Sequence, residues 1–486
     1  MKRIIQFSLL LIVILLNSCE DKKFSHFEPT INDDINYFIW KGLNAYYLWQ
    51  KDVPDLADNR FADFDELYTH YSGFSSPESV FNSLLNQPGT IDKYSWIVDD
   101  YIALENSFQG INLSNGMEFG LVKYTNGSSN VFGYVRYVIP NSDAFRKGIT
   151  RGMIFNIVDG TQLTLSNYKN LLFNNNTNYS IELADYNNGN PIGNNNTISL
   201  DKTQLQENPI AISKIINDGN KKIGYLMYNQ FSSSFDAELN AVFNNFKSEN
   251  INELIIDLRY NGGGSVRTAT YLGSMITGQY NDDTFSKQVW NRKVQEASDP
   301  SSFINKFTNK INNGLVNETI NSLGLTKIYF IVTGSSASAS ELVINSLSSY
   351  IDVRLVGTKT VGKQVGSITI YDSDNLKRNG NNLNPNHNYA MQPLVLEISN
   401  KDNQNHPEGF TPGVTLPGIV FAENYNNLGV LGERSDPLLN RTLTYISTNA
   451  RMNNIKEQEV ISKEIYSSKL AMPTSNNMYI ELKEDL

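Results

Sequence analysis

The stretch YFIVTGSSASASELVINSL, from Tyr329 to Leu347, constrains the fold of this chain most strongly. Its first residues are apolar and predict a buried strand over 329–332, which passes through a turn of small residues. The remainder has an apolar face at helical spacing and predicts a helix that begins near Ser338. A strand, a tight turn and a helix in direct succession indicate an α/β layer.

Ser338 is therefore placed over a helix N-terminus, where free backbone N–H groups and the helix dipole can stabilise an alkoxide or a nearby oxyanion. Lys363 follows 25 residues later, in the glycine-spaced segment GTKTVGKQVGS that runs from Gly357 to Ser367. Such a turn can bring the lysine amine back to the serine hydroxyl. No histidine lies near either residue in the sequence, so a base at this site would have to be Lys363.

The same serine has a simpler explanation. Ser338-x-x-Glu341 is the pattern of a capping box, in which serine and glutamate only satisfy free N–H groups of the first helical turn. Taken alone, the local sequence favours this structural role. The remainder of the chain is needed to decide.

Composition narrows the classes of function. With 486 residues, two or three domains are expected. The net charge of −10 argues against a nucleic-acid partner, because few basic groups remain to neutralise phosphates. Cys19 is the only cysteine and the four histidines show no ligand spacing, so we expect no internal disulfide, no metal site and no cofactor.

Residues 1–18 read as an export signal, with Lys2 and Arg3 before an apolar run that is too short to span a bilayer. The ending L-N-S-C resembles a bacterial lipobox. This resemblance implies cleavage before Cys19, a lipid on its thiol, and a protein anchored in the bacterial cell envelope, with the membrane and its face left open. The alternative is a cysteine that follows an ordinary signal peptide by chance.

After a linker at 19–31, the residue pattern predicts two domains of different character. Residues 32–104 are rich in aromatic residues and predict a helical N-terminal domain with no assigned function. Residues 105–205 predict short strands and turns and look like a PDZ domain, which captures a peptide end by backbone N–H groups and strand addition. The candidate carboxylate-binding loop is Phe119, Gly120, Leu121 and Val122. A spacer that binds nothing is the alternative.

Residues 206–450 predict a larger α/β unit with a mostly parallel sheet. A strand begins near Lys221, Ser234 is the expected cap of the next helix, and the buried strand ELIIDL runs into three glycines at Gly262 to Gly264. Such glycines can aim N–H groups at an oxyanion, or they can simply form a flexible turn. Residues 278–324 look like a polar, mobile insertion that could cover a cleft, and the tail 451–486 carries no recognised motif.

Three separated motifs occur together in this unit: IDLRYNGGG at Ile256 to Gly264, SASASE at Ser336 to Glu341, and VGTKTVGKQ at Val356 to Gln364. Together with the PDZ-like segment upstream, they resemble the C-terminal processing (tail-specific) serine proteases over residues 105–445. The resemblance implies a multidomain α+β protein: a helical N-terminal domain, a PDZ-like β domain and an α/β core of the ClpP/crotonase-like type.

The resemblance also implies roles. Ser338 would be the nucleophile and Lys363 the general base, with the N–H groups of Ala339 and of Gly262 or Gly263 forming the oxyanion hole. To accept a proton the lysine must be neutral, so burial or nearby positive potential has to lower its pKa from roughly 10.4 toward neutrality.

The chain departs from the family pattern around the lysine. Many members carry a glutamine four residues after it, whereas Ser367 stands there and Gln364 follows the lysine directly. Glu341 is the third candidate for the group that orients the lysine. A Pro-Asp pair near the end of the domain is replaced by Pro412-Gly413.

The function expected from these features is a lipid-anchored serine endopeptidase that cleaves unfolded or C-terminally presented polypeptides. Two alternatives remain open: a catalytically silent lipoprotein that binds peptides or glycans, and an esterase or amidase that uses the same serine and lysine. The substrate and the oligomeric state stay open.

Overall fold

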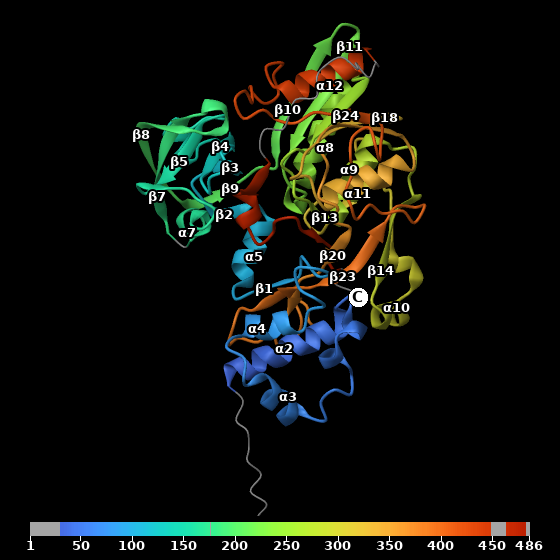
Figure 1. Ribbon diagram of the computed structural model, residues 1–486. Coiled ribbons are helices and arrows are strands. Elements are labelled where there is room, and N and C mark those ends of the chain that lie inside the picture. Colours follow the sequence, from blue (N-terminus) through green and yellow to red (C-terminus); the bar gives the residue numbers. More distant parts are fainter. Residues whose placement is uncertain (1–29, 175, 449–462, 483–486) are drawn as a thin grey trace, which may run out of the picture.

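The computed structural model describes residues 30–174, 176–448 and 463–482. Figure 1 shows three parts: a helical N-terminal part, a β domain and a larger α/β core. The export signal and Cys19 lie outside the described residues, so the lipid anchor stays a prediction. Within those described ranges, no helix is both long enough and apolar enough to cross a membrane.

The core is built on a six-stranded sheet whose strand order is β10-β11-β12-β18-β19-β24. All neighbours from β11 to β24 pair in parallel, and only the edge strand β10 is antiparallel. The strands are β10 (Ile210–Asp218), β11 (Lys221–Tyr228), β12 (Glu253–Asp257), β18 (Lys327–Val332), β19 (Asp352–Gly357) and β24 (Gly418–Val420). The mostly parallel sheet predicted from the sequence is thus observed.

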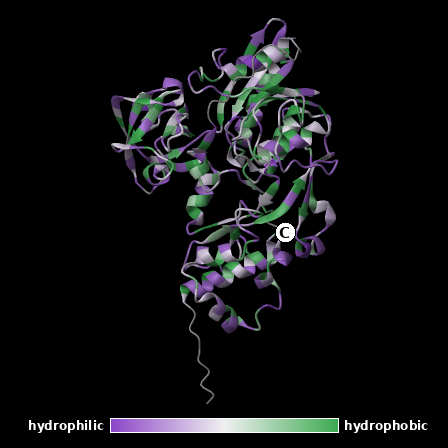
Figure 2. Ribbon diagram, in the orientation of Figure 1, coloured by the Kyte–Doolittle hydropathy of each residue, from purple (hydrophilic) through white to green (hydrophobic). Residues whose placement is uncertain are grey.

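Helices cover both faces of this sheet. Apolar residues of α8 (Asp236–Ser248), α9 (Val266–Ile276) and α11 (Ala339–Ser348) pack on one set of strand side chains, and those of α12 (Pro437–Thr448) pack on the alternate set. Strands covered on both faces must be apolar at every position, which explains runs such as ELIIDL. In Figure 2 the strands of this sheet are largely green (hydrophobic), whereas the helices mix hydrophobic and hydrophilic residues.

A second six-stranded sheet carries the lysine segment, with the order β13-β26-β20-β23-β14-β15. Its strands are β13 (Gly264–Ser265), β26 (Met478–Tyr479), β20 (Val365–Ser367), β23 (Leu394–Ser399), β14 (Thr284–Trp290) and β15 (Ile304–Lys306). The expectation of an unpatterned insertion at 278–324 was therefore wrong. β14 pairs with β23 over four residues, and α10 (Arg292–Ala297), β16 (Lys310–Asn312) and β17 (Asn317–Thr319) complete the segment.

The N-terminal part forms the helices expected from its aromatic pattern: α2 (Ile31–Tyr46), α3 (Phe64–Tyr71) and α4 (Pro77–Ser83). It then joins the core through β1 (Trp96–Val98), which pairs with β22 (Ala390–Gln392); β22 in turn pairs with β21 (Ile370–Tyr371). Residues almost 300 positions apart therefore share one small sheet. Helix α5 (Tyr101–Phe108) leads on to the β domain.

The β domain is a sheet of the order β25-β3-β4-β5-β7-β8, with β6 beside β5 and a separate β2–β9 pair at its base. Its elements are β2 (Ile111–Ser114), β3 (Met117–Lys123), β4 (Val131–Val138), α6 (Asp143–Arg146), β5 (Ile154–Val158), β6 (Thr161–Gln162), α7 (Tyr168–Leu172), β7 (Asn178–Asp185), β8 (Ile192–Asp201) and β9 (Thr203–Gln206). Phe119, Gly120, Leu121 and Val122 lie inside β3, so the prediction that they form a loop was wrong.

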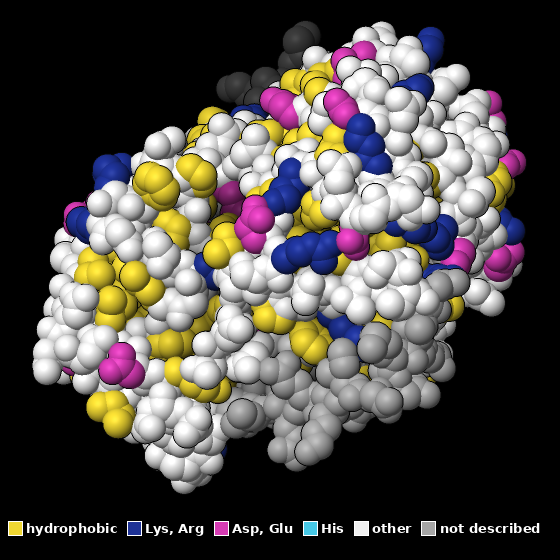
Figure 3. Space-filling model, turned by 90° about the horizontal axis from the view of Figure 1, so that it is seen from above, with side chains coloured by type: hydrophobic (Ala, Val, Ile, Leu, Met, Phe, Trp, Pro, Cys, Tyr) yellow, Lys and Arg dark blue, Asp and Glu magenta, His cyan; other side chains and the backbone are white. Residues whose placement is uncertain are grey.

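One further expectation is corrected: Ser234 lies in a short 3-10 turn, Ser233–Phe235, and the first turn of α8 has no side-chain cap. The tail, in which no motif was recognised, supplies β25 (Glu464–Ser467) and β26 to two different sheets. Seen from above in Figure 3, acidic and basic side chains are interspersed over the core face.

Candidate active site

Ser338 stands between β18 and α11 with an unusual backbone, φ 65° and ψ −116°. A residue other than glycine in such a sparsely populated region costs about 1–3 kcal/mol and needs support from its surroundings. Its N–H donates to Glu341 Oε2 at 2.8 Å, while its fully buried hydroxyl has no hydrogen-bond partner within the part of the chain described. Ser338 and Glu341 are thus arranged as the predicted capping box, but the serine hydroxyl makes no hydrogen bond of normal geometry to the first helical turn.

Glu341 ties the serine turn to the lysine segment. One carboxylate oxygen accepts hydrogen bonds from the N–H groups of Ser338 and Lys363, at 2.8 and 2.9 Å. The other accepts from the Thr360 hydroxyl at 2.5 Å and from the Gly362 N–H at 2.6 Å. Burial raises the pKa of Glu341, and these four hydrogen bonds act in the opposite direction by stabilising the carboxylate. The two predicted catalytic residues thus share one buried anchor.

Lys363 is almost completely buried, and burial lowers the pKa of its amine to about 7. The negative charges of Asp92 and Glu341 act in the opposite direction. The Nζ atom lies 4.8 Å from the centre of the Tyr94 ring. A lysine with a pKa near 7 is neutral in a large fraction of molecules at neutral pH and can accept a proton.

Ser338 and Lys363 line the same small cavity, of about 20 Å³. This volume has room for about one water molecule. The cavity wall also contains Glu341, Leu342, Asn345, Gln364, Ile398, His406, Phe410 and Met478. The structure therefore brings the predicted nucleophile and base together, in a form too closed to admit a larger ligand.

The glycine turn packs directly against the serine. A Cβ added to Gly263 would lie 2.7 Å from Ser338 Cβ and 2.9 Å from the Ala339 nitrogen, so no other side chain fits there. The N–H of Gly263 already donates to Asn261 Oδ1 at 2.8 Å. Of the two glycines predicted for the oxyanion hole, Gly262 is therefore the better donor beside Ala339.

The D-L-R part of the motif forms an ion network under this turn. Arg259 is fully buried and binds Asp257, Glu423 and Asp436. Burial alone would raise the pKa of Glu423, but Arg259 and Arg151 outweigh it and lower the pKa to about 2. Since Arg151 comes from the β domain, the network also joins that domain to the turn.

The three candidates for orienting the lysine have different positions. Glu341 holds the lysine backbone, as described above. Gln364 lines the cavity, and its buried side-chain oxygen has no hydrogen-bond partner among the described residues. Ser367 instead donates to Gln392 Oε1 at 2.6 Å, with Asn477 Oδ1 at 3.0 Å. The replacement pair Pro412-Gly413 lies in a turn in which the Gly413 N–H donates to the Leu416 carbonyl.

Sequence reasoning missed the contribution of the N-terminal part. Tyr94 covers the lysine amine, and Asp92 accepts hydrogen bonds from the Tyr94 N–H, the Ser95 N–H and the Tyr47 hydroxyl, which fixes this loop. These residues lie about 270 positions before Lys363, and no motif marks them. The described residues also contain no group of three or more His, Cys, Asp or Glu that could hold a metal ion.

Comparison with known proteins agrees with this arrangement. The profile of peptidase family S41 matches residues 222–378, and that of the peptidase S41 N-terminal domain matches residues 34–96. Two separate parts of the chain are therefore similar to domains of peptidase family S41. The second match covers the helical part that supplies Asp92 and Tyr94.

Curated relatives are distant. A probable CtpA-like serine protease of Staphylococcus epidermidis (strain ATCC 12228 / FDA PCI 1200) is 23% identical over 171 residues, which is 35% of this chain and 31% of that protein. A carboxyl-terminal-processing protease of Picosynechococcus sp. is 23% identical over 167 residues, 34% of this chain and 35% of that protein. The matches thus span about a third of each relative's length.

The fold is shared over a greater length. The crystal structure of an S41-class protein from Bacteroides fragilis NCTC 9343 has a TM-score of 0.63 and 23% sequence identity. It covers 87% of this chain and 99% of that one. The two chains therefore share their overall fold.

The lysine makes the reactivity of Ser338 dependent on pH. Below an apparent pKa of about 7 the amine is protonated and cannot accept the serine proton, so the reaction slows about tenfold per pH unit. Above this pH the rate becomes constant. The measurement is the rate at which a serine-reactive phosphonate probe labels the protein between pH 5 and pH 9. A rate that is flat across this range would contradict the assignment of Lys363 as the base.

Replacing Tyr94 tests how the lysine is kept neutral. Tyr94→Ala opens the amine to water, so the pKa of Lys363 rises toward its ordinary value and the labelling midpoint moves to higher pH. Tyr94→Phe keeps the ring and leaves the midpoint in place. If both variants behave alike, the ring is not what shields the lysine.

Replacing Glu341 tests the anchor. In Glu341→Gln an amide NH2 faces backbone donors, and each buried donor left unpaired costs about 1–3 kcal/mol. We expect a lower free energy of unfolding in urea and slower probe labelling. Glu397→Gln, at an exposed carboxylate on β23, is the matched control and should change neither.

Proposed function

We propose that this chain is a serine endopeptidase in which Ser338 is the nucleophile and Lys363 the general base. The observation that carries the proposal is that both residues line one cavity, with the lysine buried so that its pKa is about 7. The serine hydroxyl supports it, because among the described residues it has no hydrogen-bond partner, whereas a serine used only as a helix cap would bond its own helix.

The reaction follows from this geometry. Ser338 Oγ attacks the carbonyl carbon of a peptide bond while its proton passes to Lys363 Nζ. The tetrahedral intermediate collapses, the C–N bond breaks, and the lysine returns the proton to the leaving amine. Water then attacks the acyl-enzyme with the lysine again as base, which releases the new carboxyl end and restores the serine.

The negative oxygen of each intermediate would be held by the N–H groups of Ala339 and Gly262. Loss of one such donor typically costs about 2.7–4 kcal/mol of transition-state stabilisation. The close packing of the glycine turn on Ser338 supports this role, since any side chain at Gly263 would push the turn away from the nucleophile. No cofactor or metal enters this scheme.

The substrate we propose is an unfolded or C-terminally presented polypeptide. The β domain would act as a PDZ-like module, because the β3 edge beside Phe119 to Val122 accepts an antiparallel strand, as strand addition requires. Lipid attachment at Cys19 would hold the enzyme in the bacterial cell envelope. The core would be of the ClpP/crotonase-like type.

The test is cleavage of an unfolded protein by the wild type, Ser338→Ala and Lys363→Ala. We expect both variants to lose at least about 10³-fold in rate, because nucleophile and base act as one unit. Equal activity in all three proteins would contradict the proposal. Hydrolysis of small acyl esters without any proteolysis would instead favour an esterase or amidase on the same residues. Absence of probe labelling at Ser338 would favour a silent binding protein.

A further inference from the structure

The C-terminal segment 463–482 follows a path from the β domain to the nucleophile. It begins as β25, which pairs antiparallel with β3 and so becomes an edge strand of the β-domain sheet. The register sets Glu464 opposite Val122 and Ser467 opposite Gly120. This is the edge at which a peptide ligand would add under the proposed function, and in the same antiparallel sense.

Buried polar contacts fix the strand there. Glu464 forms an ion pair with the buried Arg136 at 2.5 Å and accepts a hydrogen bond from the Tyr134 hydroxyl. The Ser468 hydroxyl donates to Glu118 Oε2 at 2.7 Å and accepts from the Phe119 N–H at 2.9 Å. Arg136 also donates to Ser335, three residues before the nucleophile.

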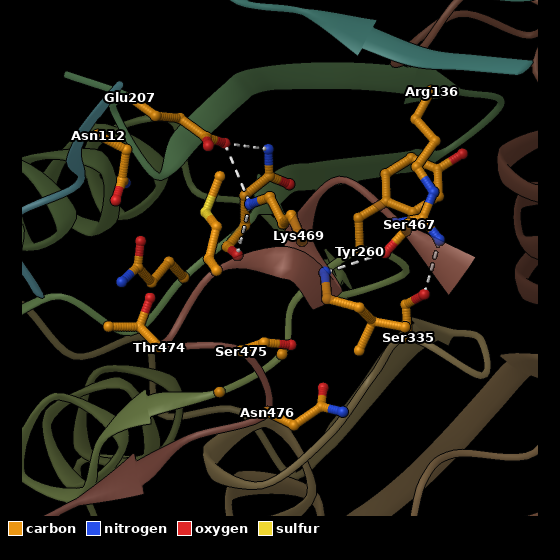
Figure 4. Close-up of a pocket in the computed structure, with 16 residues that line it drawn as sticks. Asn112, Arg136, Glu207, Tyr260, Ser335, Ser467, Lys469, Thr474, Ser475 and Asn476 are labelled. Atoms are coloured by element: carbon orange, nitrogen blue, oxygen red, sulfur yellow. Dashed lines mark hydrogen bonds and ion pairs between the residues drawn. The ribbon is translucent and has the colours of Figure 1, made fainter. Parts of the chain in front are cut away.

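The segment then crosses a pocket of about 50 Å³ between the β domain and the glycine turn (Figure 4). Lys469 reaches Glu207 and the Asn229 carbonyl on one wall of this pocket. Gly262, Gly263 and Ser335 line the same pocket together with Ser475 and Asn476 of the segment. The polypeptide therefore lies directly on the turn proposed to hold the oxyanion.

The next residues reach the nucleophile. The point where a Cβ on Gly263 would lie is 2.6 Å from the Asn477 carbonyl oxygen, 2.7 Å from Ser338 Cβ and 2.9 Å from the Ala339 nitrogen. Met478 is fully buried and forms part of the wall of the Ser338–Lys363 cavity. Asn476 lines the larger pocket and Met478 the smaller one, so the chain at 476–478 separates the two spaces.

We propose that segment 463–482 is a built-in occupant of the polypeptide-binding path and must leave before a substrate can bind. This rests on the proposed function and deepens it. The Asn477 carbonyl of the segment lies beside Gly263, close to Ser338 and the Ala339 nitrogen, and the first strand of the segment takes the place of a bound peptide tail. The small catalytic cavity is then what remains of a channel that the segment fills.

The contacts of the segment also describe the substrate class. The path fits an extended polypeptide whose acidic side chain pairs with Arg136. Four positions later, a small hydroxyl residue would bond Glu118 and the Phe119 N–H. An unbranched apolar side chain would then fill the wall of the catalytic cavity. In the resident segment, the acidic and apolar residues are 14 positions apart. A substrate that lacks the acidic residue would leave the buried charge of Arg136 without its carboxylate partner.

A binding experiment tests the occupant without catalysis. The full-length protein carries Ser338→Ala, and the probe is a fluorescent synthetic peptide of residues 463–482. Glu464→Lys places a like charge beside buried Arg136 and should release β25. We expect the peptide to bind this variant at least about tenfold more tightly, because the tethered segment no longer competes at high effective concentration.

Controls separate this inference from the proposed function. Glu238→Lys, at an exposed carboxylate on α8 that takes part in none of these contacts, should leave peptide binding unchanged. Ser468→Ala is the milder second variant in case Glu464→Lys does not fold, and it should raise peptide binding in the same direction. With Ser338 restored, both variants should also label faster with the serine-reactive probe.

Two results would overturn the inference. Folded Glu464→Lys and Ser468→Ala proteins that bind the peptide no better than the parent would show that the segment is a permanent strand. Faster labelling after adding the peptide to these variants would show that the segment completes the site instead of blocking it. If the variants bind the peptide more strongly but the protein with Ser338 restored cleaves no substrate, the inference about the segment holds and only the proposed peptidase activity is refuted.

Discussion

The whole arrangement depends on one buried carboxylate. Glu341 accepts hydrogen bonds from the backbone of Ser338, on the parallel sheet side, and from the backbone of Lys363, which leads into the second sheet. Two sheets that are far apart in sequence thus meet at a distance set by a single side chain. Because a buried carboxylate is costly unless its lone pairs are satisfied, the four donors around Glu341 have little freedom to move apart.

The second constraint is that Lys363 must be neutral, and part of what keeps it neutral comes from outside the α/β core. The pKa of Lys363 is lowered by burial, and part of the cover is the Tyr94 ring from the N-terminal part. Asp92 positions that loop but also favours the protonated amine. The pKa near 7 is therefore a balance between a hydrophobic cover and two nearby carboxylates. This gives the helical domain a chemical role that its aromatic composition does not suggest.

The sequence predicted what local patterns encode. Alternation, apolar runs and turn residues located the strands of the parallel sheet, the helix after Ser338 and the glycine turn. Pairings between distant segments were not predictable: β14 lies in a stretch that looked polar and mobile, and β26 comes from a tail without a motif. Similarly, the serine at position 367 faces Gln392 and not the lysine, which depends on how two strands pack. The roles assigned to Ser338 and Lys363 remain predictions that the geometry supports.

The closed cavity also contains buried polar atoms that a substrate could bind. Ser338 holds a strained backbone, and neither its hydroxyl nor the Gln364 side-chain oxygen in the same cavity has a hydrogen-bond partner in the described part of the chain. Each buried polar atom without a partner costs free energy that a bound polypeptide can recover by supplying backbone N–H and C=O groups. The resident segment brings a carbonyl close to this point, yet neither side-chain oxygen gains a hydrogen bond from it. A substrate that hydrogen-bonds both the Ser338 hydroxyl and the Gln364 oxygen would therefore bind more favourably than the segment and displace it. Because this extra binding energy arises at the nucleophile, it can lower the activation barrier of the reaction.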